Sequence, residues 1–175
     1  MTEANTRGTK GHLADLFLNE LRRQLLDLTY TMWTDEDLEL IVPAAHPEVG
    51  GCYACADDEQ IIVGWEKYLP HGYFSPLYDT DLPRAEAEAK EVREAVAYIR
   101  DIVEDKVVLR VVRKGDRVVD AADYSPGEEH LIRWPRERTG PVGRFLQHLG
   151  VRRKVVQCFR WSGPATPPTP SRGKK

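Results

Sequence analysis

The sequence predicts an α+β domain, in which an antiparallel sheet of about five or six strands packs against two main helices and a short third helix. Two segments repeat apolar residues at helical spacing, and short β-like runs lie between clusters of Gly, Pro and Asp. No apolar run approaches the ~18 residues that a membrane helix needs. With 175 residues, 41% of them hydrophobic and 30% charged, the chain is long enough for one domain with its own core.

The first half of the chain predicts a helix followed by strands. Residues 10–29 form the helix, because apolar side chains recur three and four positions apart. The period then changes to two over 37–42, which predicts a strand that ends at Pro43. Two more strands are expected at 52–56 and 60–65, joined by an acidic turn. The following segment, 67–82, is interpreted as a loop rich in aromatic residues, prolines and glycines.

The second half predicts the remaining elements in order. A second helix runs from Pro83 to about Asp105, with an apolar stripe and acidic residues in its first turn. A hairpin with a glycine-containing turn follows. The last expected elements are an edge strand at 130–134, a short helix within 140–149 and a final strand at 151–161.

The ends of the chain and its cysteines indicate organisation and compartment. We expect residues 1–9 to form a flexible leader, 10–161 a single domain and 162–175 a disordered, proline-rich basic tail. No apolar run follows the first charged residues, so no signal peptide is expected. The odd number of cysteines, three, favours a reducing compartment over a disulfide scaffold. We therefore expect a cytoplasmic protein without a membrane partner.

Charge is unevenly distributed, although the net charge is only −3. Residues 35–66 hold nine carboxylates and no Lys or Arg, whereas 133–175 hold eleven basic residues and a single acid, Glu137. Such asymmetry indicates charged partners, unless the two segments neutralise each other within the fold.

The segment 65–78 is the best candidate for a recognition surface, because six aromatic or histidine side chains lie within its fourteen residues. Large, rigid Trp and Tyr side chains anchor many protein interfaces. Trp65 and Phe74 are expected to fold inward over the sheet, and one or two exposed members would be enough for an anchor. Together with the acidic turn, the predicted contact surface comprises Asp57, Asp58, Glu59, Trp65, Tyr68, His71 and Tyr73.

A pattern over residues 60–120 resembles small bacterial α+β proteins of the toxin-immunity type. It consists of Gly64-Trp65-x-x-Tyr68-x-x-His71-x-x-Phe74, then an acidic helix with A-x-x-x-I-x-D-I over 95–102, then the 106–113 strand and a charged Gly turn. The resemblance implies a binding protein that occludes a partner enzyme and performs no catalysis. The acidic segment would then meet a basic partner, where charge complementarity mainly raises association rate and specificity.

A second hypothesis is a nucleic-acid-associated module in the basic C-terminal third. There cations alternate with aromatic residues, a combination that can bind phosphates and stack on bases. The isoelectric point near 6.0 counts against this interpretation, because such domains are usually basic. The candidate residues are Arg136, Arg138, Arg152, Arg153, Arg160 and Trp161.

A third hypothesis is a small metal-dependent enzyme around His46, Cys52, Cys55 and His71, because C-x-x-C with two histidines resembles half of a zinc site. Residues three apart on a strand point to opposite faces, so ordinary half-buried cysteines are favoured. A carboxylate pair in the acidic turn is a further option, and the signatures of phosphate-binding loops, serine hydrolases and zinc proteases are absent. We therefore assign no catalytic residue, metal or cofactor.

Overall fold

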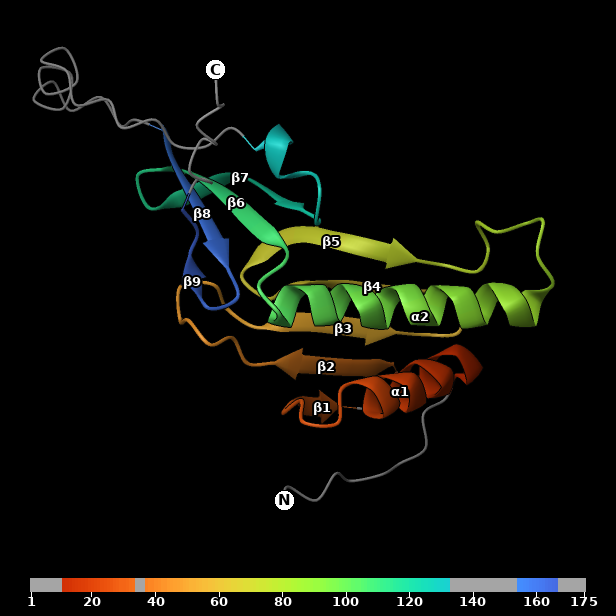
Figure 1. Ribbon diagram of the computed structural model, residues 1–175. Coiled ribbons are helices and arrows are strands. Elements are labelled where there is room, and N and C mark those ends of the chain that lie inside the picture. Colours follow the sequence, from red (N-terminus) through yellow and green to blue (C-terminus); the bar gives the residue numbers. More distant parts are fainter. Residues whose placement is uncertain (1–10, 34–36, 133–153, 167–175) are drawn as a thin grey trace, which may run out of the picture.

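A computed structural model describes residues 11–33, 37–132 and 154–166 (Figure 1). The molecule is α+β, as expected, but its strands form two sheets rather than one. The helices are α1 (His12–Gln24), α2 (Arg84–Val103) and a single 3-10 turn at Glu129–Leu131. The strands are β1 (Thr31–Trp33), β2 (Leu38–Val42), β3 (Cys52–Ala56), β4 (Ile61–Trp65), β5 (Tyr68–Phe74), β6 (Val108–Lys114), β7 (Arg117–Tyr124), β8 (Lys154–Arg160) and β9 (Gly163–Pro164).

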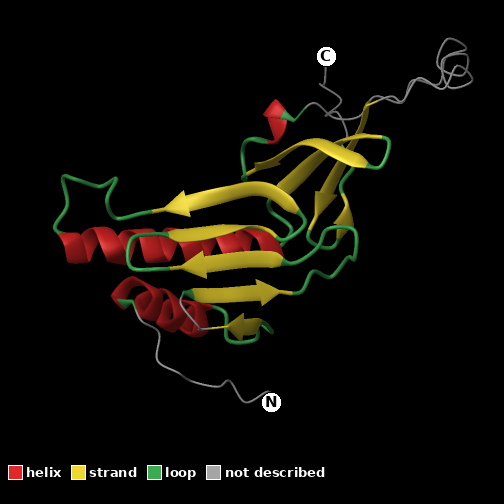
Figure 2. Ribbon diagram, turned by 180° about the vertical axis from the view of Figure 1, so that it is seen from behind, coloured by secondary structure: helices red, strands yellow, loops and turns green. Residues whose placement is uncertain are grey.

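The first sheet is a five-stranded antiparallel meander in the order β1-β2-β3-β4-β5. Alternation along β2 buries Leu38, Leu40 and Val42 and turns the residues between them to the other face. The register places Leu40 opposite Ala54, and Ala54 opposite Val63, so that one row of small and branched side chains forms the inner face. Both helices cover this inner face, and none of the described helices lies over the outer one (Figures 1 and 2).

The helices fit this face through the stripes that their sequences predict. In α1 the buried side chains include Leu13, Phe17 and Leu21. In α2 they include Val96 and Ile99, and α2 packs beside α1 and over β4 and β5. Within the described residues, no helix is long and apolar enough to cross a membrane.

The second sheet has the order β7-β6-β8-β9 and lies at one end of the first (Figure 1). β6 and β7 form the expected hairpin, whose turn contains Gly115 at φ 63°, a conformation that favours glycine. Leu109 and Val111 of β6 and Phe159 of β8 belong to the same buried cluster as the helices and the first sheet. A single core therefore joins the two sheets.

Several expectations from the sequence need correction. Residues 68–74, expected as loop, form β5, an edge strand of the first sheet, where Pro70 is tolerated because one side of the strand makes no ladder bonds. Of the edge strand expected at 130–134, the described residues 130–132 form no strand and Glu129–Leu131 form the 3-10 turn, whereas 133–134 lie outside the described residues. β9 continues the second sheet into the segment expected as tail, and the three-residue β1 was not predicted. The leader 1–9 and the short helix within 140–149 lie outside the described residues.

Candidate functional site

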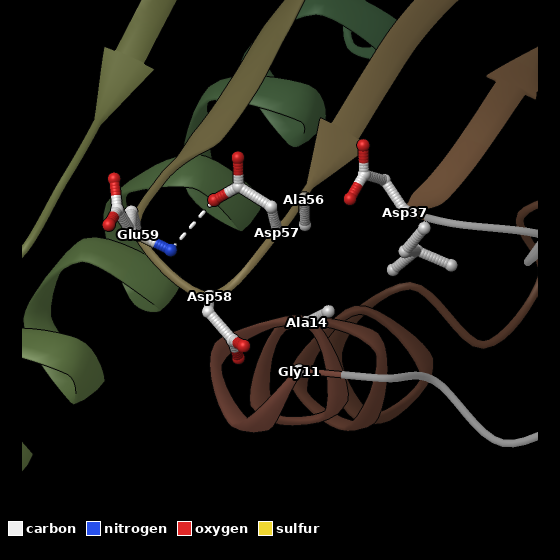
Figure 3. Close-up of a pocket in the computed structure, with 8 residues that line it drawn as sticks. Gly11, Ala14, Asp37, Ala56, Asp57, Asp58 and Glu59 are labelled. Carbon is white, nitrogen blue, oxygen red and sulfur yellow. Dashed lines mark hydrogen bonds between the residues drawn. The ribbon is translucent and has the colours of Figure 1, made fainter.

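The acidic turn between β3 and β4 is tied into the fold by its own carboxylates. Asp57 Oδ1 accepts hydrogen bonds from the backbone N–H groups of Glu59, at 2.7 Å, and Gln60, at 2.8 Å (Figure 3). Asp58 Oδ1 accepts one from the N–H of His12, the first residue of α1, at 3.0 Å. Only Glu59 leaves an exposed carboxylate with no bond to the described residues. Two of the three turn acids therefore have structural roles.

A pocket of about 290 Å³ opens beside this turn, between the start of α1 and the start of β2. Figure 3 shows that the side chains of Asp37 and Asp57 flank it, while Asp58 points toward α1. Across the described part of the chain, no group of three or more His, Cys, Asp or Glu side chains is arranged to hold a metal ion. The described lining, with four carboxylates, makes this pocket an acidic hollow.

Trp65 and Tyr68 lie in the core, and this corrects their place in the predicted contact surface. Trp65 is 3% exposed and packs against Trp161 with ring centroids 6.3 Å apart. Tyr68 is 6% exposed, and its hydroxyl donates to the carbonyl of Glu48 at 2.9 Å. Neither side chain is available to a partner without rearrangement. His71 lies on β5 opposite Gly64, and its side chain is outside the described part of the structure.

Tyr73, by contrast, is 54% exposed and lies on the outer face of the first sheet. The register aligns one outward row across the five strands, and a second row runs beside it. The rows are Trp33-Glu39-Cys55-Ile62-Tyr73 and Thr31-Ile41-Tyr53-Gly64-His71. We call this surface, with Thr31, Trp33, Glu39, Ile41, Tyr53, Cys55, Ile62 and Tyr73 as its described side chains, the open face.

The open face is unusually apolar for a sheet surface turned toward solvent. Antiparallel sheets with one buried face normally carry polar side chains on the other. Here Trp33 is 46% exposed at one edge and Tyr73 at the other, with Ile41, Tyr53, Cys55 and Ile62 partly exposed between them. Contiguous exposed apolar surface of this kind marks interaction sites.

Among the described side chains of strands β1–β5, Glu39 is the formal charge on this face, and Asp37 lies just before β2. Partial burial raises the pKa of the Cys55 thiol, and the carboxylates of Asp37 and Glu39 raise it further. Burial likewise raises the pKa of the Tyr53 hydroxyl, with Glu39 and Asp37 again contributing. Both shifts indicate a partly desolvated surface on which a further negative charge is disfavoured.

The proposed metal-ligand set is not brought together. Cys52 is buried on the inner face of β3, whereas Cys55 lies on the open face, as period-two geometry requires. Burial raises the pKa of the Cys52 thiol to about 12, so it stays protonated. His46 lies in the β2–β3 loop, where its Nδ1 accepts the N–H of Glu48.

The residues of the nucleic-acid hypothesis are only partly described. Arg136, Arg138, Arg152 and Arg153 lie outside the described residues. Arg160 is half-buried and donates to the carbonyl of Asp105, and Trp161 is buried against Trp65. The one aromatic ring in that set is therefore not exposed for stacking on a base.

Five residues of this surface were not predicted from the sequence as a group: Trp33, Glu39, Ile41, Tyr53 and Ile62. The alternation in 37–42 showed that Glu39 and Ile41 would share a face. Only the register shows that five strands align these faces, and β1 carries Trp33 in a strand too short to predict.

Comparison of the chain with protein-family models, curated protein sequences and solved structures found no match.

Proposed function

We propose that the chain is a non-catalytic protein-binding domain, of the kind that inhibits a partner enzyme as immunity proteins and antitoxins do, and that it binds through the open face. The supporting observation is the aligned outward row from Trp33 to Tyr73, in which aromatic and aliphatic side chains stand where a solvated sheet would carry polar ones. Exposed aromatic side chains supply large contact areas at little entropic cost, which is why they anchor interfaces.

The negative charge of this face favours a partner with basic side chains. Residues 31–66, which supply four of the five strands, contain no Lys or Arg, and Glu39 lies within the face with Asp37 beside it. A partner segment that carries Lys or Arg among apolar residues complements this pattern. A second copy of the chain does not, because it would place another acidic face against Glu39.

The test is a comparative capture from lysate of the source cells with tagged wild type and three variants. Tyr73→Ala and Trp33→Ala remove the two exposed aromatic rings of the face, and Tyr78→Ala removes a still more exposed ring in the β5–α2 loop as a control. We expect a protein that wild type and Tyr78→Ala retain and that the two face variants lose, with affinity reduced about tenfold or more for an anchor residue.

Charge and nucleic acid are tested in the same experiment. Glu39→Lys should weaken capture of that protein and reduce its sensitivity to salt, because an attractive charge is replaced by a repulsive one. Half of each lysate is treated with nuclease. A partner retained equally by all face variants contradicts the proposal, and capture that disappears only with nuclease favours the nucleic-acid hypothesis instead.

A further inference from the structure

A second pocket, of about 430 Å³, lies where the two sheets meet, away from the open face and from the acidic turn. Its volume falls within the range of sites for small organic ligands, roughly 300–1,000 Å³. The β2–β3 loop, the β4–β5 turn and strands β6 and β8 contribute its lining. The lining residues are Pro47, Glu48, Lys67, Tyr68, Arg113, Gln157 and Phe159. We call it the junction pocket.

Arg113 is the central polar group of this pocket. The guanidinium is half-buried, and both of its described hydrogen bonds go to neutral oxygen atoms: Nε donates to Gln157 Oε1 and Nη2 to the Tyr68 hydroxyl, each at 3.1 Å. No carboxylate of the described residues forms an ion pair with it. Arg110, three positions earlier on the same strand, has Asp120 at 2.6 Å. A half-buried cation that makes no ion pair with a described carboxylate favours an anionic ligand.

The two contacts also orient the guanidinium. Tyr68 donates its own proton to the Glu48 carbonyl, so its oxygen is left to accept from Arg113. Gln157 Oε1 accepts from Nε and so fixes a second edge of the planar guanidinium of Arg113. Arginine has five N–H donors, of which these bonds use two, so three remain, two on Nη1 and one on Nη2. One N–H from each nitrogen forms an end-on fork, which matches the two oxygens of a carboxylate or phosphate group.

A second cation stands at the mouth of the pocket. The Lys67 ammonium donates to the Pro47 carbonyl and likewise forms no ion pair with a described carboxylate. Its stem lies against Gly50, which has φ 79°, and a Cβ there would come within 2.7 Å of Lys67 Cγ. Because Gly50 has no Cβ, the methylene stem of Lys67 can pack directly against its backbone. Glu48 is the one acid of the lining; it is exposed, and its carbonyl makes the contact to Tyr68.

We propose that the junction pocket binds a small organic anion, a carboxylate or a phosphate ester with an apolar body. The anionic group would lie against Arg113 and Lys67, and the apolar body against the exposed ring of Pro47. This site is independent of the open face, and the proposal holds whether or not a protein binds there.

The test measures binding to the full-length protein by calorimetry and by NMR titration. The probes are phenyl phosphate, benzoate, inorganic phosphate and neutral benzyl alcohol. We expect wild type to bind phenyl phosphate or benzoate more tightly than inorganic phosphate, because the ring adds apolar contact, and to bind benzyl alcohol weakly or not at all. The ranking of phenyl phosphate against benzoate identifies the anionic group.

Three variants locate the site. Arg113→Gln should weaken binding of the preferred anion about tenfold or more, the effect of losing a hydrogen-bonded charge. Lys67→Gln, at an exposed position, should weaken it by a smaller factor and remains informative if Arg113→Gln fails to fold. Lys114→Gln, the exposed neighbour on β6 outside the pocket, is the matched control and should leave affinity unchanged. The proposal is overturned if wild type binds neither aromatic anion at about 10 mM, about ten-thousandfold above a micromolar dissociation constant. It is also overturned if folded Lys67→Gln and Arg113→Gln bind as wild type does.

Discussion

Glu91 shows how a single titratable side chain can oppose the stability of the fold. It lies in α2, is 7% exposed, and its nearest cation, Lys90 Nζ, is 3.9 Å away and also pairs with Asp79 at 2.7 Å. Burial raises the pKa of the Glu91 carboxyl, and the charge of Glu94 and a hydrogen bond with Asp79 raise it further. The folded state therefore binds the Glu91 proton more tightly than the unfolded state does.

The consequence is a pH-dependent effect of Glu91→Gln. A raised carboxyl pKa contributes stability that is fully present below the unfolded-state pKa and is lost as the pH rises through the folded-state pKa. At pH 7 wild type holds a poorly solvated charge, so Glu91→Gln should raise the free energy of unfolding by about 0.5–1 kcal/mol. The gain should shrink toward zero near pH 4, where wild type is protonated.

Urea unfolding at several pH values measures this difference. Glu94→Gln is the matched control, because it removes an exposed charge one turn along the same helix. It relieves only the repulsion between the carboxylates of Glu94 and Glu91. It should give the smaller gain at pH 7. Equal stability of wild type and Glu91→Gln at every pH would show that Glu91 is adequately solvated or paired.

Helix α1 depends on a cap that comes from another element. Its N-cap residue is Gly11, which has no side chain to accept a hydrogen bond from the first turn. Asp58, forty-six residues away in the β3–β4 turn, accepts the N–H of His12 instead, and its charge also suits the positive end of the helix. A Cβ at Gly11 would lie 2.5 Å from Asp58 Oδ1, so the glycine permits this close approach.

Asp58→Ala should therefore lower the free energy of unfolding by about 1 kcal/mol, the typical cost of losing an N-cap. Glu59→Ala removes the neighbouring exposed carboxylate, which makes no bond to a described residue, and should change stability by less than about 0.5 kcal/mol. Chemical denaturation of wild type and both variants measures these differences in the free energy of unfolding. Losses of the same size in both would mean that general turn acidity, rather than the cap, stabilises this region.

At the scale of the whole molecule, the two sheets share one core. Trp65 of the first sheet and Trp161, just after β8 of the second, pack at 6.3 Å with their rings inclined by 48°. Both belong to the large buried cluster that also contains residues of α1 and α2. Domains held by one core usually unfold in a single cooperative transition.

Trp161→Ala tests this coupling and should cost about 3–5 kcal/mol, the usual loss for removing a buried indole. Trp161→Phe retains an aromatic ring and should cost less. Thermal unfolding is followed by circular dichroism and by tryptophan fluorescence, and the two curves should coincide for wild type. Separate transitions in wild type, or a negligible effect of Trp161→Ala, would show that the sheets are stabilised independently.

Local patterns in the sequence determined the α+β class, both helices, the β6–β7 hairpin and the opposite orientations of Cys52 and Cys55. Each depends on spacing within a few residues, either the 3.6-residue period of helices or the two-residue period of strands. Tertiary structure alone decided the division into two sheets and the capping of α1 by Asp58. It also placed Trp65 in the core, aligned the open face and brought Arg113 beside Tyr68. These features join residues tens of positions apart, and their pairing follows from the packing of the whole core, which no local period encodes.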